Sequence, residues 1–449
     1  MTCSTSRCRP QYFLLFASLL LLLAAPAAAQ DWFRTGTGLG VEKPRVAVAD
    51  FAPRSPSAQP LADIFSTVLR ADLEYSGIIE VVSKSMNPLQ SPSVPAEVRH
   101  AEWSAPPAES HLLAYGNLSA SGNDLVIEAW LSDARNAQAP PVLGKRYRGE
   151  VTDAQIRRFA HQFADEIVAR LSGGMPGVAS TQVAFVSTRT GAKEIWAMDY
   201  DGANQRPLTS LHTISLTPRW SPDGLRIAFT CYGLAGGVTS AQICLYSMET
   251  GKPMAFMRYR GTNSSPAWSP DGSKIMFMSS MHGDPELFMI DSTGSNLRRI
   301  TYSAGVDTSP AWNPKTGQQV AFISDRGGLP NLYLMNADGS NVEKLEMQDK
   351  GYVIDPAWAP NGQLLAFSWR RPNGNYDLYV MDTASRQIVE LTRDAARNER
   401  PSWAPDGRHI IFESTRTGTR QIWTMLADGT QARQLTFEGH NESPNWSPR

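Results

Sequence analysis

The segment Pro266-Ala-Trp268-Ser-Pro270-Asp271-Gly272, with the apolar run that ends in Phe277, recurs in similar form along the last three-fifths of this chain. The tryptophans of successive copies stand 48, 44, 46, 45 and 43 positions apart. A repeat of this length is typical of a β-propeller, in which each copy forms one four-stranded blade. The six tryptophans are Trp220, Trp268, Trp312, Trp358, Trp403 and Trp446.

Each copy reads as four short strands separated by turns. Trp268 lies in the first strand, and the Pro-Asp-Gly turn joins it to an apolar strand at 275–278. Proline fixes φ and Asp-Gly tolerates a positive φ, so this tripeptide favours a tight turn. Further apolar stretches at 286–290 and 297–301 complete an antiparallel meander. Such a meander exposes two apolar faces and must stack on its neighbours.

The two ends of the repeat region indicate six blades. The final copy stops just after Trp446, whereas the first copy begins at Val183 and lacks the tryptophan strand. We therefore predict that Trp446 supplies the innermost strand of the blade that begins at Val183, which closes the ring. A β-sandwich with chance similarity is the alternative, although sandwiches rarely show six units in phase. The predicted inner tryptophans should be buried core residues.

The first 29 residues have the pattern of a secretory signal peptide. Arg7 and Arg9 are basic, residues 13–23 are apolar, and Ala27-Ala-Ala29 forms a cleavage site. The apolar stretch is too short to span a membrane stably, and the residue directly after the cleavage point, Gln30, is not the cysteine of a lipoprotein signal. We expect an exported protein that starts near Gln30. No other stretch approaches membrane length, so we expect no direct insertion into a membrane.

Charge and cysteine content narrow the function further. The 42 basic and 43 acidic residues nearly balance, which gives no indication of a nucleic-acid partner. Cys231 and Cys244 lie on two predicted neighbouring strands of one blade. Antiparallel neighbours bring Cβ atoms within disulfide reach, and an exported protein meets an oxidising compartment. A disulfide and two singly packed thiols both remain open.

Residues 44–171 predict a separate domain ahead of the propeller. The expected order is β-α-β, a hairpin and a final helix, which gives a small mixed sheet with helices on one side. Thr152 and Gln155 form a capping-box pattern at the start of the final helix. Residues 172–181 read as a linker. The expected elements are a strand at 45–51, a helix from Pro60, a strand at 78–82, a long loop at 85–109 and a hairpin at 111–131. The fold is thus an α+β N-terminal domain followed by an all-β, six-bladed propeller over 182–449.

The order of these parts resembles the TolB family, the periplasmic propeller proteins of the Tol–Pal envelope system. The resemblance rests on the leader, the Trp103…Tyr115-Gly116 segment, the join from Met175 to Val183, and the truncated last repeat. It implies a periplasmic adaptor without enzymatic activity or cofactor. It also implies that one propeller face binds the Pal lipoprotein, that the system supports outer-membrane integrity and constriction at cell division, and that the protein is a monomer.

The resemblance also implies that residues 30–43 bind a TolA-like inner-membrane protein. Trp32 and Phe33 would be the contact residues. The segment lacks the acidic, alternating apolar pattern that the family leads us to expect, and a disordered leader is the alternative.

Variable loops before each Pro-x-Trp motif are the candidate binding face. These loops meet near the axis because the tryptophan strand is innermost, and variable loops on a rigid scaffold commonly carry binding. The resemblance places Pal contacts at Thr262, Ser265 and Thr308. The loops also carry a predicted partial acidic collar, for which capping of nearby backbone N–H groups is the alternative. The collar comprises Asn263, Asp307, Asp355, Glu399 and Glu442, with arginines beside it at Arg326, Arg370, Arg371, Arg400, Arg416 and Arg420.

Catalytic and metal motifs are missing from the sequence. It has no Gly-x-Ser-x-Gly, no His-Glu-x-x-His, no Cys/His cluster and no glycine-rich phosphate loop. We therefore predict no catalytic, metal or cofactor site, and we interpret Asp223, Asp271 and Asp406 as turn residues. Two alternatives remain: a scaffold for an unrelated partner, and a propeller polysaccharide lyase. The lyase would draw on three histidines in or beside the loops, His212, His282 and His440.

Overall fold

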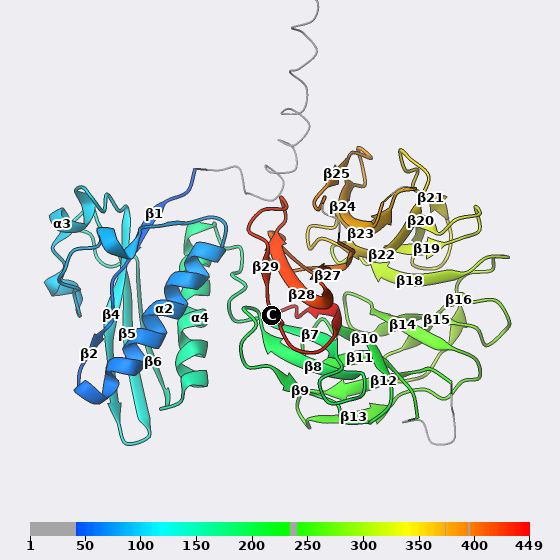
Figure 1. The fold of residues 1–449 in the computed structure, drawn as a ribbon, viewed down its shortest axis with the longest axis horizontal. Coiled ribbons are helices and arrows are strands. Elements are labelled where there is room, and N and C mark those ends of the chain that lie inside the picture. Colours follow the sequence, from blue (N-terminus) through cyan, green and yellow to red (C-terminus); the bar gives the residue numbers. More distant parts are fainter. Residues whose placement is uncertain (1–41, 234–239, 373, 394–395) are drawn as a thin grey trace, which may run out of the picture.

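The computed structural model describes residues 42–233, 240–372, 374–393 and 396–449. Residues 1–41, with the signal segment and the candidate contacts Trp32 and Phe33, lie outside the described residues. Figure 1 shows a small domain with two long helices lying beside a ring of sheets. No helix within the described ranges is long and apolar enough to cross a membrane.

The N-terminal domain is built on a mixed sheet with the order β3-β1-β4-β5-β6, and β2 pairs with β4. β1 runs parallel to β3 and β4, whereas β4, β5 and β6 form an antiparallel meander. The predicted hairpin is confirmed as β4 and β5. β6 was not predicted because its sequence, Leu-Gly-Lys-Arg-Tyr-Arg-Gly-Glu, is polar and largely exposed at the sheet edge. The strands are β1 (Arg45–Val48), β2 (Ala52–Pro53), β3 (Glu80–Val81), β4 (Leu112–Ser121), β5 (Asp124–Asp133) and β6 (Leu143–Glu150).

Two amphipathic helices, α2 (Gln59–Tyr75) and α4 (Asp153–Leu171), pack together and share one core with the sheet. The predicted cap of α4 is confirmed, because Thr152 Oγ1 accepts a hydrogen bond from Gln155 N at 3.2 Å. The expectation of a plain loop over 85–109 is wrong in part. That stretch contains the short helix α3 (His100–Ser104), because Trp103 buries its ring, 1% exposed, in a second core cluster with Tyr115. Three 3-10 turns also occur, η1 (Pro56–Ala58), η2 (Lys84–Met86) and η3 (Pro95–Glu97).

Six four-stranded antiparallel sheets form the propeller, as the repeat predicts. Blade 1 holds β30 (Asn441–Trp446), β7 (Gln182–Ser187), β8 (Glu194–Asp199) and β9 (Arg206–Pro207). Blade 2 holds β10 (Ser215–Trp220), β11 (Arg226–Cys231), β12 (Gln242–Ser247) and β13 (Lys252–Ala255). Blade 3 holds β14 (Asn263–Trp268), β15 (Lys274–Ser279), β16 (Glu286–Asp291) and β17 (Arg298–Arg299).

The remaining blades repeat this order around the ring (Figure 1). Blade 4 holds β18 (Asp307–Trp312), β19 (Gln319–Ser324), β20 (Asn331–Asn336) and β21 (Glu343–Lys344). Blade 5 holds β22 (Tyr352–Trp358), β23 (Leu364–Arg370), β24 (Tyr376–Asp382) and β25 (Ile388–Glu390). Blade 6 holds β26 (Asn398–Trp403), β27 (His409–Thr417), β28 (Thr419–Leu426) and β29 (Arg433–Gln434).

The predicted ring closure is confirmed. β30 pairs antiparallel with β7, and Trp446 lies opposite Val183. Its indole Nε1 donates to Thr181 Oγ1 at 2.7 Å, which ties the last strand to the linker. The Trp268, Trp358 and Trp403 indoles instead donate to a carbonyl of the preceding blade, each at 3.1 Å. Five of the six inner tryptophans are buried as expected, and Trp312 is half-buried.

The two domains meet through polar side chains that are buried. The Tyr75 hydroxyl at the end of α2 donates to Thr424 Oγ1 at 3.0 Å, and the Tyr75 carbonyl accepts from His409 Nε2 at 2.7 Å. The Arg433 guanidinium stacks 3.5 Å from the centre of the Tyr75 ring. The Tyr200 hydroxyl of blade 1 donates to Asp72 of α2 at 2.5 Å. These contacts join the helices of the N-terminal domain to blades 1 and 6.

Candidate functional site at the mouth of the propeller channel

Each innermost strand is interrupted by a β-bulge just before the proline of the Pro-x-Trp motif. The residue at the bulge adopts a positive φ in every blade, between 48° and 56°. Bulges re-aim a side chain out of the regular alternation of a strand. These six side chains consequently line the channel along the axis. They are Thr217, Ser265, Ser309, Asp355, Arg400 and Ser443.

The channel encloses about 520 Å³ and has an uneven lining. The walls are the prolines and tryptophans of all six repeats, and the bulge residues add polar groups. Blades 3 and 4 contribute only the hydroxyls of Ser265 and Ser309 to this ring. Blades 5 and 6 contribute Asp355 and Arg400. Among the six bulge residues, charge is therefore confined to blades 5 and 6, and the other blades contribute only hydroxyl groups.

The predicted acidic collar is not a continuous ring, because its members occupy three different positions before the proline. Asn263 and Asp307 stand three residues before it, and both are 0% exposed inside their blades. Asn263 Oδ1 accepts from Ser279 Oγ at 2.6 Å, and Asp307 pairs with Arg326 at 2.6 Å. The Arg326 guanidinium in turn lies over the ring of Phe322. These two predicted contacts therefore hold the blade together and are not presented at the channel mouth.

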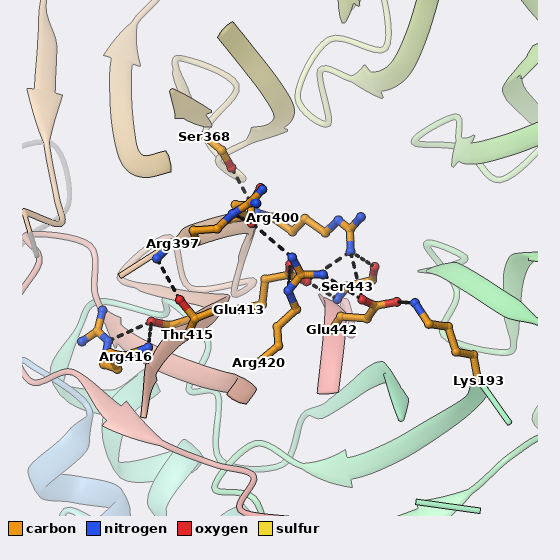
Figure 2. A network of polar contacts seen from close by, with 12 residues as sticks. Lys193, Ser368, Arg397, Arg400, Glu413, Thr415, Arg416, Arg420, Glu442 and Ser443 are labelled. Carbon is orange, nitrogen blue, oxygen red and sulfur yellow. Dashed lines mark hydrogen bonds and ion pairs between the residues drawn. The ribbon is translucent and has the colours of Figure 1, made fainter. Parts of the chain in front are cut away.

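Glu399 and Glu442 stand two residues before the proline and belong to a network of ion pairs. Glu442 pairs with Lys193 at 2.5 Å and with Arg420 at 3.1 Å. Glu399 pairs with Arg397 at 2.8 Å. Figure 2 shows Lys193 and Arg420 converging on Glu442, with Arg400 beside them. The predicted negative charge is thus largely neutralised by cations from blades 1 and 6.

Glu413 of β27 lies at the centre of this network and is 1% exposed. It pairs with Arg400 at 3.2 Å and Arg420 at 3.3 Å, and accepts from Ser443 N at 2.7 Å. Burial raises the pKa of Glu413, although both arginines oppose that rise. Burial also acts to raise the pKa of Glu442, but the hydrogen bond and charge of Lys193 bring it below its ordinary value. Removing either arginine would leave Glu413 as a buried charge with one cation fewer.

Asp355 and Arg219 provide further charge inside the channel. Burial raises the pKa of Asp355, and its Oδ2 atom is buried without a hydrogen-bond partner among the described residues. Burial lowers the pKa of Arg219 to about 10. Buried acceptors are normally satisfied, so Asp355 Oδ2 is open to a donor from a bound molecule.

The remaining predicted contacts lie just before the prolines of blades 3 and 4. Thr262 is exposed in the loop before β14, where its backbone N–H donates to Ser280 Oγ at 2.9 Å. Thr308 is half-buried on β18 opposite Ile323. Ser265 lies in the channel ring. Of the predicted contacts, Ser265 and Asp355 therefore line the channel, whereas Thr262 and Thr308 lie outside its lining.

Profiles of known families cover almost the whole described chain. The "TolB amino-terminal domain" family matches residues 37–139, and the "TolB beta propeller domain" family matches residues 169–354 and 347–449. The chain belongs to the TolB family. The Tol-Pal system protein TolB of Bordetella pertussis is 32% identical over 438 residues, which cover 96% of this chain and 95% of that protein. A protein TolB homolog of Chlorobium chlorochromatii is 30% identical over 254 residues, which cover 57% of this chain and 55% of that protein.

The crystal structure of TolB from Acinetobacter baumannii has the same fold. It superposes with a TM-score of 0.76 at 24% identity and covers 91% of this chain and 98% of that one. The expectation of a TolB-family member with an α+β domain and a six-bladed propeller is therefore confirmed.

The histidines considered for a lyase site do not meet in this TolB-family chain. His212, His282 and His440 are exposed, and within the described residues none of them lines the channel. The turn aspartates Asp223 and Asp271 bond to their own turns, as expected, through Leu225 N and Ser273 N at 2.9 and 3.0 Å. Asp406 makes the same turn bond, through Arg408 N at 2.9 Å, and in addition is buried at the domain junction, where it pairs with His409 at 2.7 Å.

Two residues of the site were missed from the sequence, the channel-lining Arg219 and the buried Glu413 of the ion-pair network, and each carried a usable signal. Glu413 follows the apolar run Ile410-Ile-Phe412, where a carboxylate must be buried and paired. Arg219 occupies the middle of Pro-x-Trp, where the other repeats have Ala, Ser or Asn. Because Arg219 is charged where the other repeats have a small neutral side chain, it marks blade 2 as a blade whose channel lining departs from the repeat.

Cys231 and Cys244 form a disulfide in the structure, with Cα atoms 5.9 Å apart. They lie on β11 and β12, and Cys231 is opposite Gln242, so the bridge runs diagonally across one face of the strand pair. Both residues are buried in the core between blades 1 and 2.

Proposed function

We propose that this chain is the periplasmic adaptor of a Tol–Pal system and that it binds the Pal lipoprotein at the mouth of its propeller channel. Membership of the TolB family and likeness to Tol-Pal system proteins named TolB support the system. In this role the protein acts by binding, without a catalytic step, and supports outer-membrane integrity and constriction during cell division.

The uneven channel mouth is the observation that carries the proposed Pal site. Loops of varied sequence surround a rigid ring of six bulge residues, and the interior offers the unpartnered Asp355 Oδ2. Binding energy in such interfaces is concentrated in a few buried central residues with a near-neutral rim. Asp355 and Arg400 fit the central role, and Thr262 and Thr308 fit the rim.

The segment 30–43 is the proposed site for a TolA-like inner-membrane protein. The support is its place directly after the predicted cleavage point, with two aromatic residues, Trp32 and Phe33, as candidate contacts. Capture of a TolA periplasmic domain by the full mature chain, and its loss when residues 30–41 are deleted, would test this half. Undiminished capture by the deleted chain would contradict it.

A single substitution in the channel ring tests the Pal site. Ser265→Arg places a guanidinium in the neutral half of the channel, at a backbone conformation that Arg400 already adopts in blade 6 at φ 56°. We expect the fold to tolerate it and the affinity for the Pal periplasmic domain, measured by calorimetry, to fall by about tenfold or more.

The matched control is Ser295→Arg, which adds the same side chain to an exposed turn between β16 and β17. It should leave Pal affinity unchanged. Equal affinity of wild type and Ser265→Arg, with both variants folded, would contradict binding at the channel mouth.

A further inference from the structure

A histidine and two aspartates converge where the N-terminal domain meets blade 1. His161 lies on α4, Asp199 ends β8, and Asp201 lies in the turn that follows. One potential ligand atom from each lies within 4.8 Å of the other two. We propose that these residues bind a divalent cation of the zinc type and that this cation bridges the two domains. The proposal concerns a site separate from the channel and does not depend on Pal binding.

The orientation of His161 is the strongest support. The residue is 3% exposed, and its Nδ1 atom bonds to Asp72 Oδ2 at 2.7 Å. Its Nε2 atom is buried and has no hydrogen-bond partner among the described residues. Metal-binding histidines characteristically use one ring nitrogen for the metal and the other for a carboxylate, which fixes the ring. Asp72 is itself held by the Tyr200 hydroxyl at 2.5 Å, so the imidazole is fixed from behind.

Blade 3 shows what the same turn looks like without a ligand histidine. There Asp291 accepts from Asn296 at 2.6 Å, just as Asp199 accepts from Asn204 at 2.6 Å. Lys274 Nζ neutralises the other oxygen of Asp291 at 2.8 Å. The residue that corresponds to Lys274 in blade 1 is the uncharged Gln182, which pairs with Asp199 in the sheet. Asp199 Oδ1 accepts no hydrogen bond from the described residues, so blade 1 keeps a carboxylate oxygen for a ligand.

Two carboxylates attract a dication to the site, and nearby guanidinium groups compete with it. Arg157, also on α4, forms an ion pair with Asp201 Oδ2. At the site itself, two carboxylates and one guanidinium leave net negative charge beside Nε2. The adjoining pocket, about 740 Å³, is lined by His161 and Asp199 and gives solvent ions access to the site, although Arg158, Arg206 and Arg449 also line it.

The donor set indicates the class of ion. One imidazole nitrogen and two carboxylate oxygens suit Zn²⁺, with a water as the fourth ligand. Tetrahedral ligands at about 2 Å from the metal lie about 3.3 Å apart, so the three atoms need to close by about 1.5 Å at most. Side-chain rotation of the two aspartates would supply this. Because His161 comes from one domain and the aspartates from the other, a bound ion would hold α4 against blade 1.

Calorimetric titration of the purified, chelator-free protein with ZnCl₂ tests the site. We expect wild type to bind at this site and His161→Gln and Asp199→Asn to bind at least about tenfold more weakly. Arg157→Gln removes the competing cation and should tighten binding. The melting temperature should rise with Zn²⁺ for wild type and not for His161→Gln.

Two controls sharpen the test. His282→Gln removes an exposed histidine, and Asp291→Asn alters the equivalent turn of blade 3, so both should bind Zn²⁺ like wild type. If His161→Gln fails to fold, Asp199→Asn provides the test of Zn²⁺ binding. Asp199 is half-buried, and asparagine has nearly the same shape as aspartate, so this variant should fold. Absence of Zn²⁺ binding by wild type, or wild-type affinity in the folded variants, would overturn the proposal.

Discussion

Replacing Trp446 with alanine should lower the free energy of unfolding more than the same replacement of Trp312, the equivalent tryptophan of blade 4, which is less buried. Trp446 is 4% exposed, and its indole donates to Thr181 Oγ1 at 2.7 Å. It lies on the only strand of blade 1 that comes from the end of the chain (Figure 1). Truncating a buried tryptophan to alanine costs about 3–5 kcal/mol. We expect Trp446→Ala to fall in this range.

Trp312 is the matched control, because it occupies the same position of the repeat in blade 4. It is half-buried, and its Nε1 atom has no hydrogen-bond partner among the described residues. Trp312→Ala should therefore cost about 2 kcal/mol less, of which about 1 kcal/mol reflects the missing hydrogen bond. Trp446→Phe, which keeps most of the apolar area, should cost about 1 kcal/mol for the hydrogen bond alone.

Urea unfolding followed by far-UV circular dichroism and by tryptophan fluorescence provides the assay. The comparison is valid where the two signals give coincident transitions. A larger loss of stability in Trp312→Ala than in Trp446→Ala would refute the reasoning that the closing strand is a critical seam of the ring.

Three further predictions concern charge and covalent structure. Glu442 has a lowered pKa in the folded state, so its stabilising effect is present above its ordinary value of 4.5 and is lost as the pH falls through the folded pKa. Wild type should therefore exceed Glu442→Gln in stability at pH 7, and the two should converge in acid; a constant difference across that range would contradict the pairing with Lys193. His409→Ala should cost about 2 kcal/mol or more, because it leaves the buried Asp406 with Arg408 as its remaining ion-pair partner and removes the donor to the Tyr75 carbonyl, whereas the exposed His440→Ala should cost almost nothing; equal effects in urea unfolding would contradict the junction contact. Thiol titration of the denatured, unreduced mature protein should find no free cysteine, and two free thiols would contradict the Cys231–Cys244 bridge.

The six-bladed architecture could be predicted from the sequence because the same strand and turn motifs recur in each repeat. The phase of the Trp and Pro-Asp-Gly motifs fixed six blades, and the complementary fragments at Val183 and Trp446 predicted the seam. Local chemistry also sufficed for the cap at Thr152. The edge strand β6 escaped prediction, since a polar edge strand lacks the apolar alternation that marks a buried one.

The sequence predicted the face of the propeller that carries the candidate site, but not the individual side chains that form it. The sequence predicted that the loops before the Pro-x-Trp motifs meet near the axis. It could not predict which side chains face the channel, because a shift of one residue along a strand turns a side chain from the channel toward the blade. The bulge before each proline changes that alternation, which placed Asn263 and Asp307 inside while turning Ser265 and Asp355 toward the channel. The cations that neutralise Glu442, Lys193 and Arg420, come from other parts of the chain, so sequence spacing could not reveal them. His161 and Asp199, from different domains, carried no shared pattern at all.

Hydrogen exchange of the protein with and without the Pal periplasmic domain tests the central claim most directly. Binding at the channel mouth predicts slower exchange in the loops at 259–265, 302–309, 347–355 and 437–443. The turns at 199–204 and 291–297, which join the outer strands, should exchange unchanged. Protection of those turns without protection of the channel-mouth loops would contradict the account.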